Sequence, residues 1–122
     1  MDKIHSFASV AASMLDTQKA LMHALPLQAD GVTPAALPAG GVPSWTLDAT
    51  TFATIDPTVD PTGLSCEIIG VKGSPGVATA TVSFTNADGS VASGTVVMTI
   101  TKNPAEIDVA SFGTVVDAPV NQ

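Results

Sequence analysis

The sequence predicts an all-β protein, a sandwich of about seven short strands with an N-terminal arm or short helix. Residues 64–101 are rich in Val, Ile and Thr, and their apolar and polar residues alternate as in strands that bury one face. Gly, Pro, Asn and Asp interrupt these strands at the spacing typical of a sandwich. With 122 residues, of which 45% are hydrophobic, the chain is long enough for one buried core.

Alternation predicts five strands in the middle of the chain. They cover residues 44–47, 52–55, 64–68, 77–85 and 95–101. Turns are expected at 72–76 and 86–90, because Gly tolerates positive φ and Asn and Asp bond to their own backbone. The apolar side of these strands, which includes Cys66, Val82 and Met98, is the predicted core.

The N-terminal third fits two patterns. Helical spacing is followed by Phe7, Val10, Ala11, Met14, Gln18, Leu21, Met22 and Leu25, so a helix from Ile4 to Leu25 is one reading. Alternation is followed by Leu21, His23, Leu25 and Leu27, and Pro26 ends any helix near Leu25. Because a sandwich needs a first strand, we expect an arm or short helix over residues 1–16 and then a strand within 19–29.

The chain therefore divides into an arm over residues 1–16, a sandwich over 17–103 and a C-terminal strand or tail over 104–122. On a helix, an apolar stripe is formed by Ile4, Phe7, Val10 and Met14. This stripe either packs on the domain's own sheet or docks on a partner subunit, and both readings stay open. The tail alternates at Ile107, Val109, Val115 and Val116, as expected of an edge strand or of a segment that lies on a neighbour.

Charge and composition exclude several classes of function. The chain has 4 Lys, no Arg and 11 acidic residues, a net charge of −7, so binding to a phosphate backbone is unfavourable. No apolar run reaches the roughly 18 residues of a membrane span, and the polar residues of the first segment weaken any export signal. The single Cys excludes an internal disulfide and a thiolate metal cluster.

Each candidate for chemistry has a simpler structural explanation. Cys66 alternates with Leu64 and Ile68, which predicts a buried thiol, and Trp45 is expected to fill the core rather than to stack on a sugar. His5 and His23 share no carboxylate at ligand spacing. No nucleophile motif surrounds Ser44, Ser65 or Ser83. The Asp-Pro turns at Asp56 and Asp60 offer too few oxygen ligands for calcium. The pair Gly40-Gly41 lacks the following Lys and the helix that a phosphate-binding loop requires. We therefore expect no enzyme activity, cofactor or metal.

Four segments carry a family resemblance. They are Gly41-Val42-Pro43-Ser44-Trp45-Thr46, Phe52-Ala53-Thr54-Ile55, Gly63-Leu64-Ser65-Cys66-Glu67-Ile68-Ile69-Gly70-Val71 and Pro75-Gly76-Val77-Ala78-Thr79-Ala80-Thr81-Val82. In order and spacing this pattern resembles bacterial and phage Ig-like domains of the group 2 type, over roughly residues 19–102. The sequence departs from the family in two places. Residues 47–51 lack the family's usual Ser-Ser-Asn/Asp-Pro, and the chain has additional residues at both ends that the domain pattern does not explain.

The resemblance implies an Ig-like sandwich with a structural or adhesive role. With no convincing export signal, it points to a structural protein of a tailed-phage virion, most simply a capsid decoration or head-fibre protein that docks through its terminal arm. The expected partners are the major capsid protein or another virion protein and sister copies in a homo-oligomer, without nucleic acid or membrane. The expected location is the virion, assembled in the host cytoplasm. The alternative is a cell-surface or glycan-binding Ig-like adhesion module.

Overall fold

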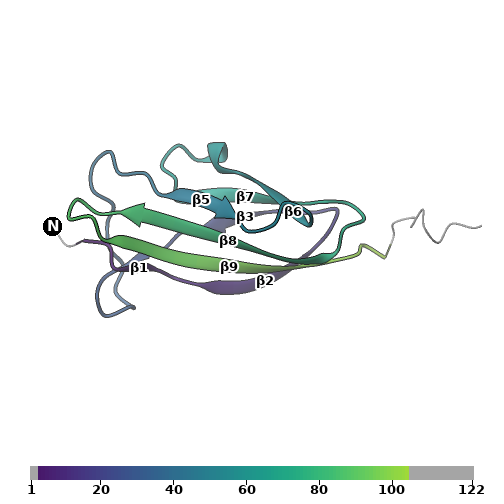
Figure 1. The fold of residues 1–122 in the computed structure, drawn as a ribbon, viewed down its shortest axis with the longest axis horizontal. Coiled ribbons are helices and arrows are strands. Elements are labelled where there is room, and N and C mark those ends of the chain that lie inside the picture. Colours follow the sequence, from purple (N-terminus) through teal and green to yellow (C-terminus); the bar gives the residue numbers. More distant parts are fainter. Residues whose placement is uncertain (1–2, 105–122) are drawn as a thin grey trace, which may run out of the picture.

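The computed structural model describes residues 3–104, which form two packed β-sheets (Figure 1). The larger sheet has the strand order β2 (Val10–Leu15), β9 (Val91–Thr101), β8 (Gly76–Thr85) and β5 (Ser44–Leu47). The smaller sheet has the order β3 (Lys19–His23), β7 (Ser65–Gly70) and β6 (Ala53–Asp56). The predicted all-β sandwich is confirmed.

Three short elements complete the described part of the chain. Strand β1 (Ser6–Phe7) pairs antiparallel with β4 (Pro26–Leu27), and a single 3-10 turn, η1, covers Pro57–Val59. All five strands predicted after residue 40 are present. Predictions for residues 105–122, including the alternating tail, lie outside the described residues.

The core lies between the two sheets and follows the predicted alternation. Along β9, Ala92, Val96, Met98 and Ile100 are buried, and the residues between them face outward. The other sheet contributes Cys66 and Ile68, both with no exposed surface. Period-2 alternation therefore sorts the side chains of these long strands correctly between core and solvent.

The N-terminal segment corrects the expectation of an arm or short helix. Residues 6–7 and 10–15 are strands, and β2 pairs in parallel with β9 from Val10↔Val96 to Leu15↔Thr101. After a turn at residues 16–18, β3 enters the opposite sheet. Helical spacing arose because apolar residues of two consecutive strands, one in each sheet, happen to lie three or four positions apart.

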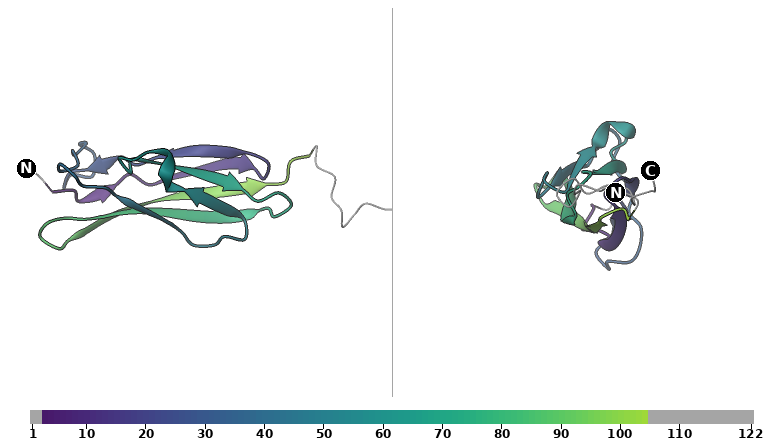
Figure 2. Two further views of the ribbon diagram at one scale, coloured as in Figure 1. Left: turned by 90° about the horizontal axis from the view of Figure 1, so that it is seen from above. Right: turned by 90° about the vertical axis from the view of Figure 1, so that its right-hand side faces the viewer.

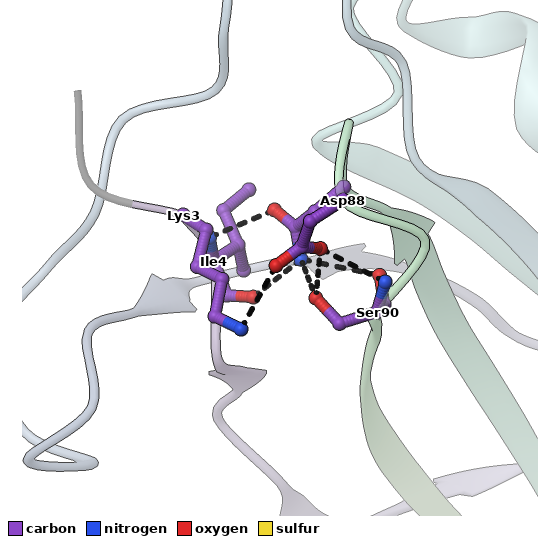
Figure 3. A network of polar contacts seen from close by, with 5 residues as sticks. Lys3, Ile4, Asp88 and Ser90 are labelled. Atoms are coloured by element: carbon purple, nitrogen blue, oxygen red, sulfur yellow. Dashed lines mark hydrogen bonds and ion pairs between the residues drawn. The ribbon is translucent and has the colours of Figure 1, made fainter.

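Side-chain hydrogen bonds hold the start of the chain against the turn between β8 and β9. The Asn86 side chain accepts from the backbone N–H of Ile4 (3.0 Å) and donates to the Ile4 carbonyl (2.8 Å), and both groups are buried. Figure 3 shows Lys3 and Ile4 beside Asp88 and Ser90, with the Lys3 ammonium 3.1 Å from the Asp88 carboxylate. The N-terminal segment is therefore part of the fold.

Strand β1 crosses close over β9 at Gly94. A Cβ atom added at Gly94 would lie 2.6 Å from the Phe7 carbonyl oxygen and 2.7 Å from the Phe7 Cβ. Any larger residue would have to push the two segments apart, so glycine permits this contact.

The described chain enters and leaves at opposite ends of an elongated sandwich (Figure 2). Residue 3 lies at the β8–β9 turn, whereas Asn103 lies at the other end, beside the turn that joins β2 to β3. The first long strand and the last strand run side by side in the same direction.

Candidate functional site

The four residues predicted to form a docking stripe do not form one surface. Ile4, Phe7 and Met14 are buried in the domain's own core, whereas Val10 is 55% exposed. Ile4 and Phe7 lie under the end of the sandwich where β1 crosses β9, and Met14 lies opposite Ile100. Three of the four side chains are therefore inaccessible to a partner, and the prediction of a docking arm is wrong. The segment packs on the domain itself, which was the other possibility left open by its sequence.

An apolar groove opens along one side of the sandwich, between the edge strands β2 and β3. Its volume is about 360 Å³, and its lining combines Val10, Ala12, Leu21, Met22 and Met98. Val10 and Ala12 stand on the same face of the sheet as the buried Val96 and Met98, yet both are exposed. The two sheets therefore diverge here, which leaves inward-facing side chains in contact with solvent.

The outer face of the larger sheet carries no charge. Asp, Glu, Lys and Arg are absent from the strands β2, β5, β8 and β9, although the whole chain has 15 such residues. We call this surface the uncharged face. Its side chains are mainly hydroxyl-bearing, and they include Thr46, Thr79, Thr81, Thr95, Val97 and Thr99. The net charge of −7 thus lies on the rest of the molecule.

Four aspartates at turns share one pattern of hydrogen bonds. The carboxylates of Asp56, Asp60 and Asp88 each accept from the backbone N–H and from the hydroxyl of the residue two positions on. Asp30 binds Thr33 and Val32 in a similar way. Asp56 and Asp60, the two considered for calcium, are therefore engaged in separate turns. Within residues 3–104 no group of three or more His, Cys, Asp or Glu is arranged to hold a metal ion.

These hydrogen bonds predict a loss of stability in acid. The Thr33 hydroxyl, followed by the backbone N–H groups of Thr33 and Val32, lowers the pKa of Asp30 to about 2. The pKa of Asp56 and of Asp88 is lowered in the same way. A carboxylate with a lower pKa in the folded state stabilises the fold above its unfolded pKa of about 3.9 and loses that contribution as pH falls through the folded value. The urea midpoint should therefore stay level from pH 7 to about 5 and fall between pH 4 and 2.

A carboxyl NMR titration checks the cause directly. Asp30 should titrate near pH 2 in the native chain, and its pKa should rise towards the ordinary value in Thr33→Val, which removes the hydroxyl but keeps the acid. An unchanged titration in Thr33→Val would show that the hydroxyl does not set this pKa.

Trp45 is internal, as the sequence predicted. It is 7% exposed, and its indole N–H donates to the Gly63 carbonyl at 2.8 Å. Gly63 has a φ of +75°, and a Cβ there would lie within 2.8 Å of Pro43. Gly63 thus accommodates both a left-handed backbone and close packing. The ring is not available as a flat platform for a sugar.

Of the other candidate side chains, His23, Ser65 and Asp60 lie together, and the rest are apart from them. His5 is exposed before β1, whereas His23, at the end of β3, lies 3.0 Å from the Ser65 hydroxyl. Ser44 and Ser83 face each other on the uncharged face, with their hydroxyl oxygens 3.3 Å apart. Ser65 has His23 beside it, and its side chain also hydrogen-bonds the Asp60 carboxylate, whose pKa is lowered first by the Thr62 hydroxyl and also by Ser65 and His23. This carboxylate is bound to the serine and not to the second ring nitrogen of the histidine, and Ser44 and Ser83 bind only each other among the hydrogen bonds of the described side chains. The described geometry therefore lacks the serine–histidine–acid relay of a serine hydrolase.

Cys66 is buried with no exposed surface. Burial raises the pKa of its thiol to about 11, and the negative charges of Asp56 and Glu67 add to the effect. Because the thiolate is the reactive form, a thiol with this pKa is inert at neutral pH. The sequence prediction of a buried, structural cysteine is confirmed.

Thiol labelling tests this assignment. At pH 8 an aromatic disulfide reagent should label Cys66 at least about 100-fold more slowly in the native chain than in urea, where the thiol returns to its ordinary pKa of about 8.5. Equal rates in the two conditions would show that Cys66 is accessible.

Sequence reasoning missed Asp16, which was taken as the end of an arm. Asp16 is fully buried, and its carboxylate accepts from the backbone N–H of Gly73 (2.9 Å) and of Asn103 (3.1 Å). It thereby ties the β2–β3 turn to the β7–β8 turn and to the end of β9. A charged residue between two predicted elements gave no local signal of these long-range contacts.

Two comparisons complete the description of the site. No helix within residues 3–104 is long and apolar enough to cross a bilayer. Comparison with protein-family models finds no matching family, and comparison with curated proteins finds no match.

Proposed function

We propose that this chain is a non-enzymatic, Ig-like structural protein of a tailed-phage virion, a capsid decoration or head-fibre protein. In this proposal it docks on the major capsid protein or another virion protein, beside sister copies. It is assembled on the virion in the host cytoplasm. The docking surface is the uncharged face rather than an N-terminal arm.

The strand order supports the Ig-like part of the proposal. An Ig-type sandwich places its second, fourth and fifth strands in one sheet, and its third, sixth and seventh strands in the other. Here β3, β6 and β7 form one sheet in the matching order, and β5, β8 and β9 lie in the other together with the N-terminal strand β2. The segments that carry the resemblance supply β5, β6, β7 and the first part of β8.

The distribution of charge carries the docking proposal. Burying a charge in an interface costs free energy unless a partner compensates it, and the centres of protein interfaces are depleted of charged residues. The uncharged face spans the four strands of the larger sheet, and Asp48 borders it at the end of β5, where its carboxylate accepts from the backbone N–H of Thr79 (2.8 Å). The strands themselves can therefore be covered by a shell protein without desolvating a charge, with Asp48 at the rim of the interface.

Localisation tests the proposed function. An antibody against the purified chain is applied to density-gradient fractions from lysed cultures of the organism that encodes it. The signal is expected in the fractions that contain DNA-filled particles, and immunogold labelling is expected on their heads. Signal confined to the cell envelope would contradict the virion proposal and favour the adhesion module.

A matched pair of substitutions tests the docking surface. Thr99→Lys places a charge on the uncharged face, whereas Thr54→Lys makes the same change at an exposed strand position on the smaller sheet. We expect Thr99→Lys to weaken binding to particles at least about tenfold, since an unpaired charge would be desolvated. Thr54→Lys should bind as the native chain does. Equal binding by both variants would exclude the uncharged face as the docking surface.

A further inference from the structure

The outer edge of β2 lacks the features that usually protect an edge strand. Within residues 3–104 no strand pairs with this edge, since β2 ends the order of its sheet. Its sequence, Val-Ala-Ala-Ser-Met-Leu, contains no charge and no Pro. Native proteins ordinarily block such an edge with Lys, Pro, a bulge or a covering segment. An unprotected edge beside an apolar groove indicates that a further segment covers both.

The chain leaves the described structure at the end of this edge. After β9, the backbone N–H of Asn103 donates to the Asp16 carboxylate (3.1 Å), and the Asn103 side chain donates to the Thr17 hydroxyl (2.8 Å). Asp16 and Thr17 directly follow β2, so residues 101–103 carry the chain from β9 across the end of β2. The Asn103-Pro104 step that follows is of a kind that favours a turn.

The remaining chain has the length and the pattern needed to return along β2. Eighteen residues, 105–122, lie beyond the described part. The distance from Leu15 back to Val10 is about 17 Å at roughly 3.3 Å per residue, which five or six of them can span. Ile107 and Val109 alternate with Glu106 and Asp108. A strand here would turn two apolar side chains to one face and two acids to the other.

From these observations we propose that the first part of the tail, around residues 106–110, pairs antiparallel with the free edge of β2 in the same molecule. Ile107 and Val109 then cover the groove beside Val10 and Ala12, and Glu106 and Asp108 face water. The larger sheet gains a fifth strand, and the acidic side chains of Glu106 and Asp108 then border the uncharged face on its outer side. This inference concerns the isolated chain and does not depend on the proposed virion function.

Cross-linking tests the proposal on the full-length chain. Ala12→Cys, at an exposed position in the groove, is combined in separate variants with Ile107→Cys, Val109→Cys or Val120→Cys, and a short bismaleimide is added at low protein concentration. The native Cys66 is buried and does not compete. We expect an intramolecular product with positions 107 and 109 that forms at least about tenfold faster than with position 120, because neighbouring strands raise the effective concentration.

Each other product identifies a different occupant. A covalent dimer through positions 12 and 109 would mean that the tail of a second copy enters the groove, and it would overturn the intramolecular pairing. Equal, slow reaction at all three tail positions would also overturn it and would leave the groove open to another protein.

Amide hydrogen exchange gives an independent measurement. In the full chain, peptides covering residues 10–15 and 106–110 should both be protected. Ile107→Asp combined with Val109→Asp should speed exchange in both peptides at least about tenfold, because the added strand would be released. Val120→Asp, the matched control, should leave both unchanged. A double variant with native protection of residues 10–15 would contradict the proposal.

Discussion

Deletion of residues 1–15 is expected to unfold the domain. This change removes β1, β2 and three core side chains, Ile4, Phe7 and Met14. Removing one such side chain costs about 2–5 kcal/mol, and the whole stability of a domain is about 5–15 kcal/mol. Circular dichroism and urea denaturation should therefore show no cooperative transition for the shortened chain.

Single substitutions separate the buried from the exposed members of the same sequence stripe. Phe7 is 3% exposed and packs over Gly94, so Phe7→Ala should lower the free energy of unfolding by about 3–5 kcal/mol. Val10→Ala should change it by less than about 1 kcal/mol, because Val10 is 55% exposed. Equal, small effects of the two substitutions would mean that the N-terminal segment is the detachable arm that its sequence suggests.

Replacement of Asp16 by Ala is expected to lower the free energy of unfolding by about 2–4 kcal/mol. The substitution removes two hydrogen bonds, from the backbone N–H groups of Gly73 and Asn103 to a buried carboxylate, and a hydrogen bond to a charged group contributes roughly 1.5–3 kcal/mol. Asp16→Asn keeps one accepting oxygen and should lose about half as much. The measurement is urea denaturation at pH 7.

The neighbouring residue supplies the control for Asp16. Thr17 is exposed, and its hydroxyl accepts a hydrogen bond from the Asn103 side chain. Thr17→Ala should therefore cost less than about 1 kcal/mol. A loss in Asp16→Ala no larger than that in Thr17→Ala would show that the buried carboxylate does not hold the three segments together.

The strands after residue 40 could be predicted because each long strand buries one face. Where a strand has one face in the core and one in water, alternation along the sequence reports its orientation directly, as in β8 and β9. Trp45 and Cys66 were assigned to the core on the same grounds, and both are buried.

The N-terminal third resisted this reasoning because β2 lacks such a contrast. Residues 10–13 are exposed on both faces, since the edge of the sheet is open on that side. Because residues 10–13 show no alternation of apolar and polar side chains, no strand pattern competed with the helical spacing in this segment. The strand β3 was expected, but Ala20 and Met22 face the interior, and Leu21 is 50% exposed.

The candidate surfaces depend on which strands become neighbours. The groove forms because β2 and β3, joined by a turn at residues 16–18, are edge strands of different sheets on the same side of the sandwich. The uncharged face arises from strands that are separated by up to 75 residues of sequence, as β2 is from β9, and that all lack charged residues. No local sequence pattern reports which strands pair or which strands lie at the edge of a sheet. The groove and the uncharged face therefore could not be predicted from the sequence alone.

The parallel pairing of β2 with β9 also determines how the molecule responds to tension. A force that pulls residue 3 and residue 104 apart draws β2 towards one end of the sandwich and β9 towards the other. The load then runs along the strands and across their hydrogen bonds, so the six-residue ladder is sheared as a unit instead of being peeled open one bond at a time. A module with this arrangement holds its length under strain until the whole ladder fails in a single step.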